Sequence, residues 1–218
     1  MRVIKPSQIA LFLLFIALAT AGAIATTALL LGRLPLGDFR GLALFLSTIV
    51  FFYAYSILVY RLFLRATPLQ SGEIALGSGQ EFVYHVYILF YLIVFYPVMR
   101  SGLAPAPLMR LFYLALGTRL GRNTYCQGII HDPPFIRIGA NSTVGQSALL
   151  IPHVIEGNRL AHYPITIGDK VTIGAHSVVL SDVTIEDGAI VAAGAVVPKG
   201  SRIGSQEIWG GIPARRLL

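Results

Sequence analysis

A period of six residues runs through the second half of the chain and constrains its fold more than any other feature. From Leu120 to Ile155 the sequence divides into LGRNTY CQGIIH DPPFIR IGANST VGQSAL LIPHVI, and from Ile167 to Ile208 into IGDKVT IGAHSV VLSDVT IEDGAI VAAGAV VPKGSR IGSQEI. The first place is aliphatic in every hexad except those that begin with Cys126 and Asp132. Such fixed-period self-similarity predicts a solenoid, in which aliphatic side chains stack inward and small residues occupy the corners.

The interruption between the two runs, Glu156 to Thr166, predicts a loop inserted at one corner of the solenoid. Three hexads make one triangular coil, so stacked strands lie about 4.8 Å apart and equivalent positions recur after three hexads. Removing the interruption restores the register of the hexads. Binding and catalytic groups concentrate on loops that a rigid scaffold presents. His153, just before the loop, is therefore the leading candidate for a functional residue.

A neutral imidazole at this corner could take a proton from an attacking hydroxyl or amine. Two acids are candidates for orienting His153. Asp182 falls in the same column of the strict repeat, one coil further on, whereas Glu156 follows at His-x-x-Glu spacing. We favour Glu156 slightly, because the loop can fold back. The alternative is that His153 is a solvated surface histidine. His131 beside Asp132 lies off this column and is interpreted as a turn pair.

The first half of the chain has the composition of a membrane domain. The whole sequence is 55% hydrophobic and 12% charged, which is too apolar for an ordinary soluble domain and indicates a membrane part followed by a globular part. Three apolar runs are candidate spans by length: Ile9 to Leu31, Gly41 to Leu64 and Phe82 to Met99. Three spans would place the two termini on opposite sides. A cleaved signal peptide is the alternative for the first run.

These observations predict three segments. Residues 1–102 form a membrane domain with about three transmembrane helices, residues 103–119 an interfacial helix or linker that contains Arg110, and residues 120–218 the repeat domain with its loop at 156–166. The net charge of +7 is scattered and no RNA-binding signature accompanies it, which argues against nucleic acid as a partner. Anionic head groups and a phosphate-bearing cofactor suit such scattered charge better. A single cysteine, Cys126, excludes an internal disulfide.

The hexads resemble those of the hexapeptide-repeat acyltransferase superfamily, whose fold is a left-handed parallel β-helix. The ending WGGIPAR, Trp209 to Arg215, is similar to the Gly-x-Pro-Ala-Arg/Lys ending of its acetyltransferases. The stretches LFYLALGTRLGRN and HVIEGNRLAHYPITIGD resemble the membrane-tethered repeat modules of lysine-polymer synthetases, and polysaccharide O-acetyltransferases are similar too. Those synthetases also carry adenylation and carrier domains, to which nothing in this sequence corresponds. The resemblance therefore favours acyl transfer over amino-acid ligation.

The resemblance also implies roles for particular residues. A histidine just before such a loop is the general base of the family, and His153 matches it. Coenzyme A contacts map to a set of corner and C-terminal residues: Ala175, Ala193, Pro198, Lys199 and Arg215. Pro198 replaces the threonine common in the family, which places one side-chain contact in doubt. Asn158, Arg159 and His162 of the loop are candidates for substrate binding, although His162 is equally well explained as an exposed residue.

Zinc is not expected. Repeat proteins similar to carbonic anhydrases bind zinc through three histidines, two of them a few residues apart, and this sequence lacks such a pair. The expected protein is a homotrimeric, membrane-embedded acyltransferase that moves an acyl group from acyl-CoA to a lipid-linked or membrane-proximal acceptor. Its repeat domain is expected on the cytoplasmic side of a bacterial inner membrane. The alternatives are an aminoacyl- or peptide-bond-forming module supplied by a carrier-bound thioester, and a non-catalytic scaffold of a membrane synthase.

Overall fold

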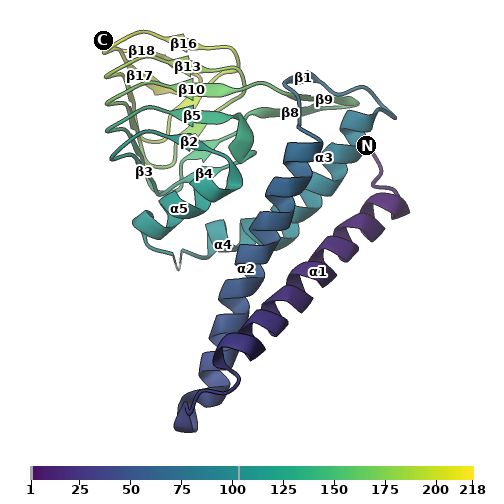
Figure 1. Cartoon of the computed structure of the whole chain (residues 1–218). Coiled ribbons are helices and arrows are strands. Elements are labelled where there is room, and N and C mark those ends of the chain that lie inside the picture. Colours follow the sequence, from purple (N-terminus) through teal and green to yellow (C-terminus); the bar gives the residue numbers. More distant parts are fainter. Residues whose placement is uncertain (1, 103) are drawn as a thin grey trace. The chain divides into compact units, whose positions relative to one another are not determined.

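The computed structural model describes residues 2–102 and 104–218, which form two compact units (Figure 1). One unit consists of Gln70–Ser78 and Phe95–Leu218, and the other of Arg2–Leu69 and Gly79–Val94. This division differs from the boundaries drawn on the sequence, because a short segment of the apolar half belongs to the repeat-containing unit. Met1 and Leu103, which the predicted ranges include, lie outside the described residues.

Helices make up most of the apolar half. The α-helices are α1 (Pro6–Leu31), α2 (Arg40–Ala66), α3 (Gly79–Leu89), α4 (Tyr96–Ser101) and α5 (Ala106–Leu116), and the shorter elements are the 3₁₀-helices η1 (Gly37–Phe39) and η3 (Pro133–Phe135) and the π-helix η2 (Phe90–Phe95). Pro6 begins α1, where its fixed φ suits the first helical position. Gly117, with φ of 112°, ends α5 in the left-handed region that glycine adopts most easily.

Three helical stretches are long and apolar enough to cross a membrane by length and composition: Pro6–Leu31, Gly37–Ala66 and Gly79–Ser101. The first two pack along each other, and the Tyr55 hydroxyl lies 2.7 Å from that of Thr26. In the third stretch the tyrosines at helical spacing are buried, and the Tyr87 and Tyr91 rings stack at 6.3 Å. These aromatic side chains therefore contribute to interior packing.

The repeat domain is a parallel β-helix, as the hexads predict. Its three faces are the sheets β16-β13-β10-β5-β2, β17-β14-β11-β6-β3 and β15-β12-β7-β4, stacked one coil upon another (Figure 1). The strands of these sheets are β2 (Arg119–Leu120), β3 (Tyr125–Cys126), β4 (Ile129–Ile130), β5 (Ile136–Ile138), β6 (Thr143–Val144), β7 (Leu149–Leu150), β10 (Ile165–Ile167), β11 (Thr172–Ile173), β12 (Val178–Val179), β13 (Thr184–Ile185), β14 (Ile190–Val191), β15 (Val196–Val197), β16 (Arg202–Ile203) and β17 (Ile208–Gly211). Strand β18 (Ala214–Arg216) folds back antiparallel onto β17.

The interior of the coils explains the composition of the hexads. First-place side chains such as Val144, Ile173 and Val191 are buried, and each contributes about 1.5–3 kcal/mol through burial. The second place is often glycine because the next coil lies very close. A Cβ atom added at Gly174 would stand 2.4 Å from the backbone nitrogen of Ala193. The hexad pattern thus follows from the apolar core and from the close stacking of neighbouring coils.

Helix α5 covers the first coil. The Arg110 guanidinium donates to the Thr124 carbonyl at 2.8 Å, and the Tyr113 hydroxyl donates to the Gly128 carbonyl at 2.8 Å. The side chains of Leu108 and Leu111 stay exposed on the opposite face of the helix. The segment for which we predicted an interfacial helix thus forms the cap that ends the solenoid, an element that repeat proteins require.

The first coil departs from the strict period of six. Ile129 pairs with Leu149 and Ile130 with Leu150, whereas the strict period would place Ile130 beside Ala148. The 3₁₀-helix η3 takes up the difference, so that Leu120 and Ile138 pair as the period requires. The corner between β4 and β5 is consequently longer than its sequence suggests, and Asp132 lies in it.

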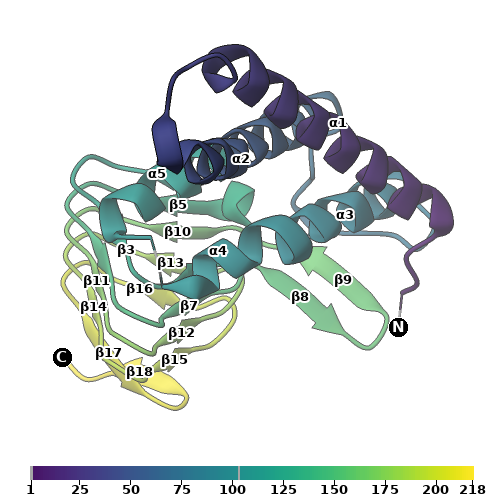
Figure 2. The ribbon, with the colours of Figure 1, turned by 90° about the horizontal axis from the view of Figure 1, so that it is seen from below.

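The inserted loop forms a hairpin of β8 (His153–Glu156) and β9 (Arg159–His162), which projects from the coils (Figure 2). The coils resume in register beyond it, because Ile138 pairs with Ile167. A third strand, β1 (Gly72–Glu73), pairs antiparallel with β9. The sequence identified an insertion at this corner, and the structure shows that the excursion begins at His153 itself.

Candidate active site

His153 and Asp132 form a buried pair at the base of the hairpin. His153 Nδ1 lies 2.5 Å from Asp132 Oδ2, and the Asp132 side chain is only 1% exposed. An ionised carboxylate is an acceptor only, so the imidazole must carry a proton on Nδ1 and donate it to Asp132. The Nε2 atom of neutral His153 then has a lone pair. Since the His153 side chain is 26% exposed, this atom can meet a substrate.

A second histidine stands on the other oxygen of the same carboxylate. His162 Nε2 lies 3.7 Å from Asp132 Oδ1, and the His162 side chain is fully buried. Its ring stacks on Phe135 with the centroids 4.4 Å apart and the planes 5° from parallel. Residues His153 and His162 face each other across the hairpin, so both strands present a histidine to Asp132.

The electrostatics of the pair follow from this geometry. Burial would raise the pKa of Asp132, but the hydrogen bond from His153 and the neighbouring His162 outweigh it and hold that pKa well below its ordinary value. Burial acts to lower the pKa of His153, but the hydrogen bond and charge of Asp132 together raise it above its ordinary value. Asp132 therefore stabilises the protonated form of His153.

His131 lies on the other side of His153. Its ring is perpendicular to that of His153 with the centroids 5.7 Å apart, and 6.0 Å from the ring of Tyr96. Burial lowers the pKa of His131, so this side chain is neutral where His153 is already partly protonated. A neutral ring beside His153 adds packing without a second positive charge.

The structure differs from the sequence-based expectation about the orienting acid. Glu156 pairs with Lys199, and its other oxygen lies 3.7 Å from Arg159. Asp182 pairs with Arg202 at 3.1 Å and donates its backbone N–H to the Tyr163 carbonyl. The strict repeat places His153 and Asp182 in one column, but the chain leaves the coil at His153 and returns at Tyr163, so that Tyr163 lies next to Asp182. Asp132 occupies the position expected of either acid.

The other predicted residues fall at three places. Ala175 and Ala193 meet at one corner of successive coils, where the Gly194 N–H donates to the Ala175 carbonyl at 2.9 Å. Pro198 and Lys199 lie at the corner next to the hairpin, and Arg215 lies on β18. Asn158 is in the hairpin turn and is exposed, as is Arg159 beside it.

A pocket of about 260 Å³ separates the hairpin from the later coils. Its lining includes Arg159, Tyr163, Ser181, Asp182 and Lys199. Across residues 2–102 and 104–218, no group of three or more His, Cys, Asp or Glu side chains is arranged to hold a metal ion.

Asp132 is the functional candidate that sequence reasoning missed. One signal pointed to it, because Asp132 occupies a first place of a hexad, where an aliphatic side chain is otherwise the rule. An acid at an inward position is costly unless it is paired, and here it is paired with histidine. The two-residue shift of β4 hid this relation, because the strict period leaves Asp132 outside the column of His153, whereas the shift brings it next to His153.

The comparison with known proteins supports the prediction of a hexapeptide repeat. The family profile described as "Bacterial transferase hexapeptide (six repeats)" matches residues 164–199. Galactoside O-acetyltransferase of Escherichia coli is 34% identical over 114 residues, which cover 47% of this chain and 55% of that protein. Mitochondrial gamma carbonic anhydrase 1 of Arabidopsis thaliana is 40% identical over 80 residues, which cover 37% of this chain and 25% of that protein. The chain thus spans only about a quarter to a half of the length of these relatives.

Among solved structures, a hexapeptide-repeat acetyltransferase from Vibrio cholerae in complex with acetyl coenzyme A matches with a TM-score of 0.47 and 21% identity, over 59% of this chain and 90% of that one. The triangular coils and the hexads make the repeat domain a β-helix of hexapeptide repeats. Residues 164–199 match the family profile, and the chain is similar to acetyltransferases of the hexapeptide-repeat superfamily.

Proposed function

We propose that the protein is a membrane-embedded acyltransferase that moves an acetyl or other short acyl group from acyl-CoA to a hydroxyl or amine of a lipid-linked or membrane-proximal acceptor. The observation that carries this proposal is the 2.5 Å bond between His153 Nδ1 and Asp132 Oδ2. It gives His153 the tautomer and the orientation of a general base. Acetyltransferases among the relatives, such as galactoside O-acetyltransferase, support the reaction class.

In this mechanism Nε2 of His153 takes the proton of the acceptor hydroxyl or amine as its oxygen or nitrogen attacks the thioester carbonyl carbon. Asp132 stabilises the imidazolium that forms. The tetrahedral intermediate collapses, the carbon–sulfur bond breaks, and the imidazolium returns the proton to the leaving thiolate. The products are the acylated acceptor and free coenzyme A, and His153 is neutral again.

Coenzyme A is proposed to lie along the corner of Ala175 and Ala193, with Pro198 alongside and Lys199 and Arg215 near its phosphates, by analogy with the family. Lys199 pairs with Glu156 here, so a phosphate would compete with that carboxylate. Because both partners are about half exposed, the pair is weak enough for a phosphate to displace it. A homotrimer would bring three such sites together at subunit seams.

Membrane embedding is supported by the three long apolar stretches. A tethered active site suits an acceptor that itself lies at the bilayer and offers little advantage for a free metabolite. The cytoplasmic face of a bacterial inner membrane is the proposed location of the repeat domain, because acyl-CoA is supplied there.

The decisive experiment measures thiol release from acetyl-CoA by the purified full-length protein, with a bacterial lipid extract as the source of acceptor. We expect release that requires both the extract and His153, so that His153→Ala abolishes it. Release with none of a series of acyl-CoA donors would overturn the proposal and favour the carrier-supplied alternative. A scaffold would keep its cellular function in the His153→Ala variant.

Zinc-dependent hydration of carbon dioxide is a second candidate, because gamma carbonic anhydrases are among the relatives. The donor atoms argue against it. Residues 2–102 and 104–218 contain no group of three or more His, Cys, Asp or Glu side chains that is arranged to hold a metal ion. Stoichiometric zinc in the purified protein together with hydration activity would favour this candidate over acyl transfer.

A further inference from the structure

We infer that the segment between α2 and α3, Gln70–Ser78, belongs to the catalytic site. Its strand β1 is the third strand of the sheet that contains His153. Glu73 in this strand is a positioning residue for His153. The inference rests on the proposed function, since it assigns to His153 the role of general base. It concerns a segment of the apolar half of the chain that belongs to the same compact unit as the coils.

The two faces of the sheet β1-β9-β8 carry different sets of side chains. Side chains alternate along each strand, and the register pairs His153 with His162 and Glu156 with Arg159. One face therefore carries the two histidines that meet Asp132. The other face carries Glu156 and Arg159, and Glu73 joins them because it pairs with Ala161.

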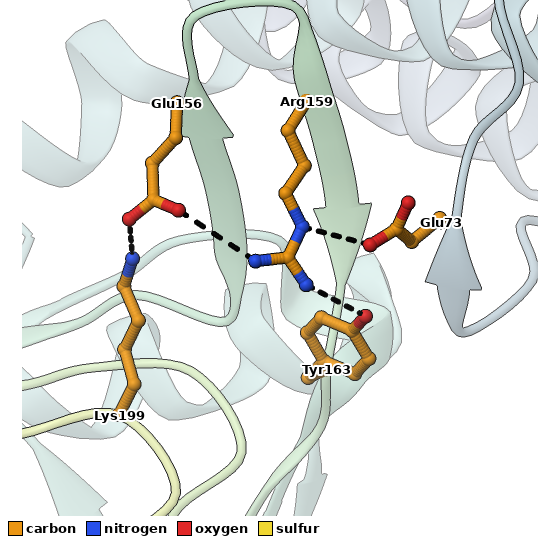
Figure 3. A network of polar contacts seen from close by, with 5 residues as sticks. All are labelled: Glu73, Glu156, Arg159, Tyr163 and Lys199. Atoms are coloured by element: carbon orange, nitrogen blue, oxygen red, sulfur yellow. Dashed lines mark hydrogen bonds and ion pairs between the residues drawn. The ribbon is translucent and has the colours of Figure 1, made fainter.

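The second face is held by a chain of polar contacts that ends on the later coils (Figure 3). Arg159 donates from Nε to Glu73 Oε1 at 2.8 Å and lies 3.7 Å from Glu156 Oε2. Its remaining nitrogen reaches the Tyr163 hydroxyl at 3.4 Å. Glu156 in turn pairs with Lys199. The network thus fixes the hairpin on the side opposite to His153, between β1 and the corner of the coil that carries Lys199.

Strand β1 also contributes backbone pairing. The Ile74 N–H donates to the Leu160 carbonyl at 2.8 Å, and the Ile74 side chain is buried. A two-stranded hairpin is marginally stable in water, whereas a third strand makes such a sheet independently stable. Without β1, strand β9 would be an edge strand and the hairpin would be free to move. Its first residue is His153, so this motion would displace the general base.

A displacement of the base matters more for rate than for stability. A misplacement of about 1 Å at a reacting group can lower the rate by about 100-fold. Exposed ion pairs such as Arg159–Glu73 contribute little to folding stability. Loss of Glu73 should therefore lower kcat while the melting temperature and the KM for the acyl donor stay nearly unchanged.

The first test compares the full-length Glu73→Gln, Arg159→Gln and doubly substituted proteins. We expect each single change to lower kcat for thiol release from acetyl-CoA by about 10- to 100-fold. The double change should cost no more than the worse single one, because both remove the same contact. Hydrogen exchange of the hairpin amides should become faster in all three. Full kcat in Glu73→Gln, or strictly multiplicative losses, would overturn the inference.

The second test replaces the ion pair by a covalent bond. Glu73 and Ala161 stand directly opposite each other in the register, so the variant Glu73→Cys/Ala161→Cys can form a disulfide. The reduced form should be as slow as Glu73→Gln, and oxidation should restore the rate. Glu73→Cys alone is the matched control and should not respond to oxidation. An oxidised double variant that stays slow would overturn the positioning role.

Failure of the proposed function would look different. It would appear as no thiol release from the unchanged protein, whereas hydrogen exchange of the hairpin would still report whether Glu73 holds it. Slow hairpin exchange that Glu73→Gln leaves unaltered would overturn the inference whatever the reaction is.

Discussion

Replacement of Asp132 by asparagine tests the core of the site with little change of shape. The carboxylate is buried and accepts a 2.5 Å bond from His153, so Asp132→Asn removes a charge while it keeps the volume. The amide offers an N–H₂ group where the carboxylate only accepts. His153 would then accept at Nδ1 and carry its proton on Nε2, which is the wrong tautomer for a base at that atom.

The magnitude follows from the hydrogen bond. A hydrogen bond to a charged group contributes about 1.5–3 kcal/mol. Loss of this bond should therefore lower the pKa of His153. The pKa of His153 falls because its burial remains and lowers the pKa when Asp132 no longer opposes it. The rate of acyl transfer should fall by about 10²- to 10⁴-fold, the usual contribution of a positioned base.

The stability of the pair also depends on pH in a defined direction. The raised pKa of His153 contributes stability that is present below its unfolded value and is lost as the pH rises through the folded value. The lowered pKa of Asp132 contributes stability that is present above its unfolded value and is lost as the pH falls through the folded value. The stability difference between the unchanged protein and Asp132→Asn should thus be largest between about pH 4 and pH 6.5.

The assay needs no acceptor. Nitrogen-15 resonances of the histidines are titrated in the full-length protein in detergent, and His153 is assigned by its loss in His153→Gln. Asp182→Asn is the matched comparison, because it makes the same chemical change at the acid that the strict repeat would choose. The His153 titration should move in Asp132→Asn and stay in place in Asp182→Asn. The reverse result, or no movement in either protein, would refute the assignment of Asp132.

Three further outcomes are expected. Gly174→Ala should lower the free energy of unfolding by about 1–3 kcal/mol in urea titrations, because the new Cβ would stand 2.4 Å from the Ala193 nitrogen; Gly41→Ala, which meets nothing within 4 Å, is its control. Cys126 is buried, and burial raises the pKa of its thiol to about 12. A maleimide should therefore fail to label it at neutral pH until the protein is unfolded. Rapid labelling of the folded protein would contradict the packing of the first coil. Arg215→Ala should raise the KM for acetyl-CoA by about 10- to 100-fold and leave kcat unchanged if its guanidinium meets a phosphate, and an unaltered KM would remove Arg215 from the donor site.

The repeat could be predicted from the sequence because one physical requirement acts at each coil. Each first-place side chain, such as Ile173, must fill the same narrow interior, and each close corner excludes a side chain, as at Gly174. The long apolar helices follow equally directly from composition and length. These requirements are local and recur along the chain, so the repeat and the helices can be recognised from the sequence alone.

The partners of His153 could not be predicted in the same way. Asp132 reaches His153 because β4 pairs two residues out of the strict period, and the Pro133–Phe135 turn restores the register at β5. The pairing of β1 with β9 joins residues far apart in the chain through a strand of two residues, which leaves no periodic signal. Both relations are set by tertiary packing, which determines the site more than the local sequence does.

The two units are interleaved along the chain, and this limits how they can be separated. The repeat-containing unit includes Gln70–Ser78, which precedes the stretch Gly79–Val94 of the other unit. A single cut after residue 102 would therefore remove β1 together with the long apolar helices. An isolated repeat domain would keep its coils but lose the strand that pairs with β9, so its hairpin would have a free edge.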